Sequence, residues 1–110
     1  MEPTTMHIPK NIQDILDLLA SMLLSSPKFV DKTGYLPFLN LDYVFQELHA
    51  GLGHNRRTLG DERYQGLMRM SGQMRAHFEA DPENNTGETR KGRDIIYVME
   101  DILRQARQRS

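Results

Sequence analysis

The sequence predicts an all-α fold, arranged as a four-helix antiparallel up-down bundle. Four segments of the 110-residue chain place apolar side chains at separations of three and four, which is typical of helices with one buried face. The connections between these segments contain the proline, glycine and asparagine residues that end helices and form turns. No segment shows a persuasive alternation of period two, so strands are not expected.

The first helix is expected to begin near Pro9 and to end before Pro27. Pro9 suits the first helical turn, because a backbone N–H has no partner within the helix at that position. Pro27 ends the helix because proline disfavours helical geometry in the residue before it. The buried stripe of this helix is expected to contain Ile12, Ile15, Leu16, Leu19, Met22 and Leu23.

The second and third helices are expected to begin at Pro37 and near Asp61, with residues 53–60 as the loop between them. A connection this short makes the two helices antiparallel, with their apolar stripes in contact. Gly51 and Gly53 are candidates for the left-handed residue that closes the second helix. The stripes are expected to contain Phe38, Leu41, Val44, Phe45, Leu48 and Leu52 in the second helix, and Tyr64, Leu67, Met68, Ser71, Met74 and Phe78 in the third.

The third helix contains Gly66 and Gly72, and each glycine costs about 1 kcal/mol relative to alanine. We therefore expect a neighbouring helix to pass close to both. Thr58 or Asp61 is expected to cap the start of this helix, and Pro82 ends it. A fourth helix is expected at residues 89–107, with Ile95, Ile96, Met99, Ile102, Leu103 and Ala106 facing inward.

Length and composition indicate a single domain spanning residues 1–110, with residues 1–8 and 108–110 expected to be frayed. A net charge of −1 argues against binding nucleic acid by bulk electrostatics. The chain has no cysteine, which excludes disulfides and thiolate chemistry. It lacks an apolar run approaching the ~20 residues that span a bilayer, and a signal peptide is not evident. We therefore expect a cytoplasmic protein without nucleic-acid or membrane partners.

The sequence offers little for catalysis. His49 and His54 are separated by two glycines and do not lie one helical turn apart, and no metal-binding histidine motif is present. The serines lack a strand-to-helix elbow, and the glycines lack the spacing of a phosphate-binding loop. We expect no catalytic residue, no metal site and no cofactor, and therefore not an enzyme.

Alternating helix directions would sort charge between the two ends of the bundle. The end with the 53–60 loop and the termini would collect basic side chains, namely Arg56, Arg57, Arg104, Arg107 and Arg109. Arg56 and Arg57 beside His54 could contact phosphate, and the alternative is an ordinary solvated loop. The opposite end gathers the 27–36 connector and the 79–88 turn, and it is acidic through Asp31, Glu79, Asp81, Glu83 and Glu88.

The acidic end is the predicted partner-binding surface. Tyrosine is favoured in binding hot spots, and carboxylates steer a basic partner toward its site. Ordinary solvation of the turns is the alternative. The residues predicted to bind a partner are Asp31, Tyr35, Asp42, Glu79, Asp81, Glu83 and Glu88, with Asp81, Glu83 and Tyr35 expected at the interface.

Four short motifs follow one another along the chain, namely Ser26-Pro27, Phe45-Gln46-Glu47-Leu48, Phe78-Glu79-Ala80-Asp81-Pro82-Glu83 and Ile95-Ile96-Tyr97-Val98. Their order resembles the small all-helical immunity proteins of interbacterial toxin systems. The likeness is closest to those paired with NAD(P)-hydrolysing effectors of type VI secretion, and it spans residues 12–102. The chain departs from that pattern in its longer 28–36 connector, its inserted Asn84 to Gly87 and its basic C-terminal extension.

The resemblance implies an inhibitor without catalytic activity, which binds a cognate protein toxin and occludes its active site. The expected toxin is an NAD(P) glycohydrolase. A pocket that holds the phosphates of a dinucleotide tends to be electropositive, and a turn bearing carboxylates can take the place of those phosphates. A helical adaptor or regulatory module without a toxin partner is the alternative, and a homodimer of the free protein is left open.

Overall fold

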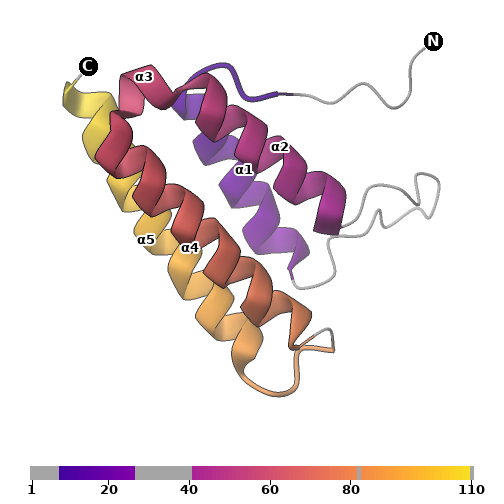
Figure 1. Cartoon of the computed structure of the whole chain (residues 1–110). Coiled ribbons are helices and arrows are strands. Elements are labelled where there is room, and N and C mark those ends of the chain that lie inside the picture. Colours follow the sequence, from indigo (N-terminus) through magenta and orange to yellow (C-terminus); the bar gives the residue numbers. More distant parts are fainter. Residues whose placement is uncertain (1–7, 27–40, 82, 110) are drawn as a thin grey trace, which may run out of the picture.

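The computed structural model describes residues 8–26, 41–81 and 83–109, and the regular elements in these ranges are all helices. In chain order they are α1 (Ile12–Ser25), α2 (Leu41–His54), α3 (Arg56–Leu59), α4 (Asp61–Glu79) and α5 (Glu88–Arg109) (Figure 1). The all-α prediction is confirmed. The number of helices differs from the four predicted, because the short helix α3 lies in the expected 53–60 loop.

The four long helices alternate in direction along the chain (Figure 1). α1 contacts α2 and α5, and α4 contacts the same two helices. In the described ranges the backbones of α1 and α4 do not approach each other closely, and neither do those of α2 and α5. Each long helix is therefore covered by two neighbours, while α3 contacts α2, α4 and α5 at one end.

The core is formed by the apolar stripes that the sequence predicts. Burying one large apolar side chain stabilises a fold by about 1.5–3 kcal/mol, so these contacts dominate its stability. Phe38 lies outside the described residues. The buried apolar side chains are Ile12, Ile15, Leu16, Leu19 and Met22 of α1, Phe45, Leu48 and Leu52 of α2, Leu59 of α3, Leu67, Met74 and Phe78 of α4, and Ile96, Met99, Leu103 and Ala106 of α5.

The start of α1 differs from the prediction. Asn11 is the N-cap, and its side-chain oxygen accepts a hydrogen bond from the backbone N–H of Asp14 at 2.8 Å. Pro9 therefore precedes the helix and is buried. A Cβ atom on Gly51 would lie 2.8 Å from the Pro9 ring, so Gly51 permits a close approach inside α2. It does not supply a left-handed closing residue, and neither does Gly53, because α2 continues to His54.

The predicted close approaches at Gly66 and Gly72 are wrong. A Cβ atom would meet nothing within 4 Å at Gly72, and only the end of the Arg69 side chain at Gly66. The close approach occurs instead at Gly92 of α5, where a Cβ atom would lie 2.5 Å from the Phe78 ring. The structure gives no packing reason for glycine at positions 66 and 72.

The start of α4 also differs from the prediction. Gly60 is its N-cap, with a φ of 86°, and no side-chain hydrogen bond caps the helix there. Neither Thr58 nor Asp61 is therefore a cap, since Thr58 lies within α3 and Asp61 is the first residue of α4. A left-handed glycine turns the chain between α3 and α4.

We predict opposite effects for alanine at two glycines. Gly92→Ala should destabilise the protein by about 1–3 kcal/mol, because a methyl group would overpack against the Phe78 ring. Gly72→Ala should stabilise it by up to about 1 kcal/mol, because the position is helical and open. Urea unfolding followed by circular dichroism measures both. A neutral Gly92→Ala variant would contradict the close packing.

Candidate functional site

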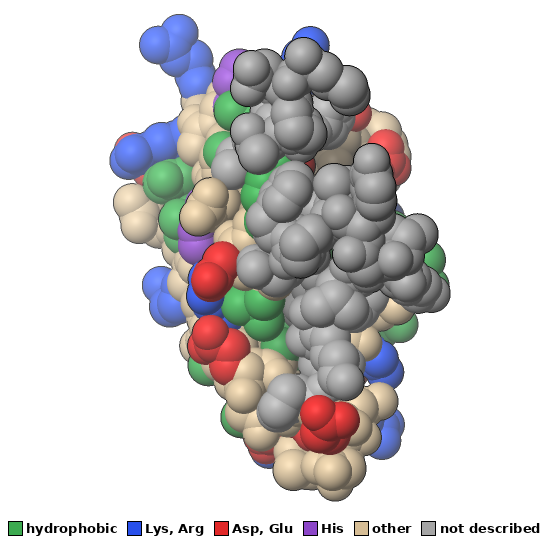
Figure 2. Space-filling view, turned by 90° about the vertical axis from the view of Figure 1, so that its right-hand side faces the viewer, with side chains coloured by type: hydrophobic (Ala, Val, Ile, Leu, Met, Phe, Trp, Pro, Cys, Tyr) green, Lys and Arg blue, Asp and Glu red, His purple; other side chains and the backbone are tan. Residues whose placement is uncertain are grey.

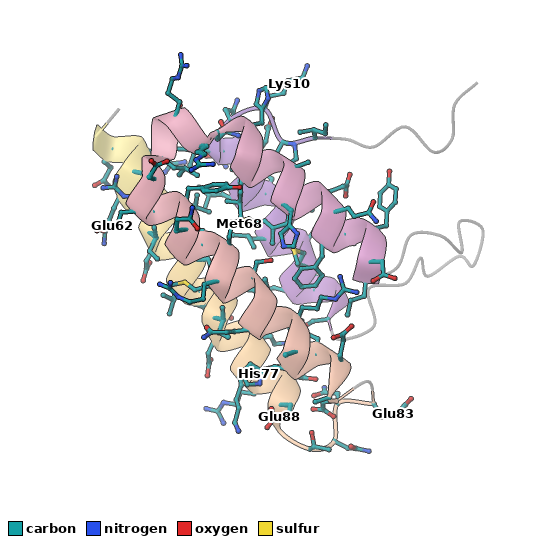
Figure 3. The ribbon with its side chains drawn as sticks, in the orientation of Figure 1. Lys10, Glu62, Met68, His77, Glu83 and Glu88 are labelled. Atoms are coloured by element: carbon teal, nitrogen blue, oxygen red, sulfur yellow. The ribbon has the colours of Figure 1, made fainter. Side chains whose placement is uncertain are left out.

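The candidate site lies where α2 begins, α4 ends and α5 begins (Figure 3). We call the carboxylates of Asp42, Glu79, Glu83 and Glu88 the acidic end. In Figure 2, acidic side chains are visible on the lower half of the molecule, toward the turn that carries Glu83. Two other predicted partner-binding residues, Asp31 and Tyr35, lie outside the described residues.

Asp81 is not the exposed contact residue that the sequence predicts, because only 1% of it is exposed. One carboxylate oxygen accepts hydrogen bonds from the backbone N–H groups of Asn85 at 2.7 Å and Thr86 at 3.1 Å. The other oxygen accepts from the N–H of Thr89 at 3.0 Å, and the Thr89 hydroxyl donates to the Asp81 carbonyl. Asp81 therefore ties the end of α4 to the start of α5.

The environment of Asp81 keeps its carboxylate ionised. Burial alone would raise its pKa, but the N–H groups of Thr89, Asn85 and Thr86 outweigh burial and lower the pKa to about 2. The turn they belong to contains two left-handed residues, Asn84 at φ 55° and Gly87 at φ 89°. This backbone conformation brings several N–H groups to one carboxylate and fixes the turn.

Arg75 forms ion pairs with two of the predicted carboxylates. The sequence analysis did not predict this role. Its Nε donates to Glu79 at 3.2 Å, and Nη2 forms an ion pair with Asp42 of α2. Its guanidinium also lies 5.6 Å from the centroid of the Phe45 ring. The Asp42 and Glu79 side chains stay 67% and 53% exposed, so a partner can reach both.

The last members of the acidic end lie on the α4–α5 turn. Glu88 pairs with Lys91 at 2.9 Å and with Nδ1 of His77 at 2.8 Å. The hydrogen bonds from Lys91 and His77 lower the pKa of Glu88. Glu83 is exposed on the turn itself, near the tip of the molecule (Figure 3). The structure thus brings four of the predicted carboxylates to one end.

A polar pair, His49 and Ser71, connects α2 to α4. Nε2 of His49 lies 2.8 Å from the hydroxyl of Ser71, which is fully buried. The His49 ring also packs edge-on against Phe45. Since no substrate could reach Ser71, this pair positions two helices and is not a catalytic dyad.

The opposite end carries the basic side chains that the sequence places there. Arg104 pairs with Asp101 at 3.5 Å, and Arg107 contacts Gln13 of α1. The side chain of Arg109 is not among those described. Arg56 and Arg57 line an open hollow beside α3.

Among the described residues, no group of three or more His, Cys, Asp or Glu side chains could hold a metal ion. Over the same ranges, none of the helices combines the length and apolar character needed to cross a membrane. Comparison with protein-family models, curated proteins and solved structures finds no match to this chain. The charged side chains at the two ends are the features of the described residues that point to a function.

We predict that Asp81 makes stability depend on acid pH. Its pKa is about 2 in the fold and 3.8 in an ordinary environment, so its contribution is complete above about pH 4. That contribution is lost as the pH falls toward 2. Asp81→Asn should lower the thermal midpoint clearly at pH 7 and by much less at pH 2. Exposed Glu62→Gln is the control, and an unchanged midpoint of Asp81→Asn at pH 7 would exclude this role.

We predict a second pH effect from His49. Burial, and then the nearby Arg75 charge, lower its pKa below 6.5, so the folded state disfavours the protonated ring. Stability should therefore be complete above pH 6.5 and fall as the pH decreases below it. Urea midpoints between pH 7.5 and 5 measure this slope. His49→Gln should flatten this slope, and an unchanged slope in that variant would contradict the assignment.

Proposed function

We propose that this chain is an immunity protein, which binds a cognate secreted antibacterial toxin and inhibits it by occluding its active site. The observation that carries the proposal is the acidic end, where Asp42 and Glu79 flank Arg75, and Glu83 and Glu88 lie on a turn fixed by buried Asp81. A charged surface on a fixed turn suits recognition of another protein.

The fixed turn favours binding because a preorganised surface loses little conformational entropy on association. The N–H groups bound by Asp81 hold the turn in place before any partner arrives. Exposed carboxylates such as Glu83 then steer a basic partner surface and raise its association rate. Asp81 thus supports the interface from beneath without touching the partner.

Existing ion pairs do not block this role. Arg75 holds Asp42 and Glu79, but both of its carboxylate partners are more than half exposed. Exposed pairs of this kind contribute little stability. An arginine or lysine of the partner can therefore replace or share Arg75 at low cost.

The proposed toxin is an NAD(P) glycohydrolase. This choice is supported by the resemblance of the sequence motifs to immunity proteins of that class. It is also supported by charge, because a dinucleotide pocket must neutralise phosphates and would accept carboxylates in their place. Glu83, on the α4–α5 turn, is the carboxylate we place in that pocket.

We predict that reversing two charges at the acidic end strongly reduces binding of the partner protein. The tagged chain is used to capture bound proteins from its native host, which are identified by mass spectrometry. A Glu79→Lys/Glu83→Lys double variant should retain less than about one tenth of the partner that the original chain captures, because two attractive charges become repulsive. Helical circular dichroism should be unchanged, since both side chains are exposed.

The control is Glu62→Lys at the other end of α4, a charge reversal at another exposed position far from the turn (Figure 3). It should capture the partner normally. Undiminished capture by the double variant would exclude the acidic end as the interface. The captured partner is then assayed for NAD⁺ hydrolysis, with and without added chain. A partner that lacks toxic activity would instead make the chain the helical adaptor considered above.

A further inference from the structure

A basic hollow lies at the corner where α2, α3 and α4 meet, remote from the acidic end. It is a shallow depression open to solvent, with a volume of about 600 Å³. The residues lining it are Gly53, His54, Arg56, Arg57, Gly60 and Asp61.

The frame of the hollow is held by a buried amide. The Asn55 side chain is buried, and its Nδ2 donates to the carbonyl oxygens of Gly51 at 2.8 Å and Pro9 at 3.3 Å. Leu59, on the other side of the corner, is 1% exposed and anchors α3 in the core. The backbone that carries the basic side chains is therefore fixed before a ligand binds.

Arg56 is oriented by two contacts. Its Nε donates to the Asp61 carboxylate at 2.9 Å, and its guanidinium lies over the Tyr64 ring at 4.6 Å from the centroid. The ion pair uses the Nε edge of the guanidinium, which leaves the two terminal nitrogens for a ligand. A guanidinium held in this way suits bidentate contact with an oxyanion.

Arg57 and His54 add exposed donors to the same hollow. Asp61 is the one carboxylate among the lining residues, and its charge is offset by Arg56. A Cβ atom on Gly53 or Gly60 would meet no atom within 4 Å, so the space beside these two lining residues is open. The balance of charge on the lining is positive.

We propose that this hollow binds a phosphate group, with Arg56 and Arg57 contacting its oxygens and the rest of a small phosphate monoester occupying the remaining volume. Two arginines on a fixed corner match a phosphate dianion better than a single carboxylate. The site is independent of the proposed inhibitor function, because it lies at the other end of α4.

The test follows backbone amide shifts of the ¹⁵N-labelled full chain during titration at 0.15 M NaCl. The ligands are ribose 5-phosphate, inorganic phosphate and ribose. We expect saturable shifts at residues 53–61 with ribose 5-phosphate and none with ribose. Inorganic phosphate binding as tightly as the sugar phosphate would identify free phosphate as the ligand. Absence of saturable shifts with both phosphates would overturn the site.

Variants distinguish a specific phosphate site from nonspecific electrostatic attraction of phosphate. Arg56→Gln and Arg57→Gln should each weaken binding about fivefold, since these charges are partly exposed. Asp61→Asn should tighten binding, because it removes the repelling negative charge, while the asparagine oxygen can still accept the hydrogen bond from Nε of Arg56. Exposed Arg90→Gln, at the start of α5, is the matched control and should bind normally. An equal loss in Arg90→Gln, or no gain in Asp61→Asn, would overturn the assignment.

Discussion

Each long helix carries one apolar stripe, and no stripe is covered unless two neighbouring helices lie against it. This constraint produces the cycle of contacts from α1 to α2, α4, α5 and back to α1. A fully buried side chain contributes about 1.5–3 kcal/mol, whereas an exposed ion pair contributes only ~0–1 kcal/mol. The exposed charged residues at the ends therefore contribute little to stability and are available for binding, whereas the buried Asp81 stabilises its turn.

The two ends share one structural device, a buried polar side chain that bonds backbone groups across a change of chain direction. Asp81 accepts hydrogen bonds from backbone N–H groups of the α4–α5 turn. Asn55, which lies between α2 and α3, donates to the carbonyl oxygens of Gly51 in α2 and of Pro9 before α1. Charged side chains around each turn are thereby held in defined positions, so the apolar core positions the helices and these two residues position the surfaces.

The stripes could be predicted from the sequence because helical periodicity is a local property, and the buried side chains follow it in all four long helices. Contacts between residues that are far apart in the sequence could not be predicted in this way. Gly51 and Gly92 are the glycines at which another residue approaches closely. Their neighbours, Pro9 and the Phe78 ring, are brought near only by tertiary packing. Asp81 lies in an acidic turn and looks exposed, since its burial depends on the left-handed backbone that follows. Helix α3 is a single turn, too short for a periodic signal.

The two candidate surfaces are separated by the length of α4, which contains 19 residues and extends roughly 28 Å at 1.5 Å per residue. Charges at that distance are largely screened, because the Debye length is about 8 Å at physiological salt. A ligand in the basic hollow would therefore not alter binding at the acidic end through its electric field. Coupling between them would require movement of α4 against α2, which the His49–Ser71 contact and the Arg75 ion pair with Asp42 both oppose. The structure thus favours two independent surfaces on one rigid helical frame.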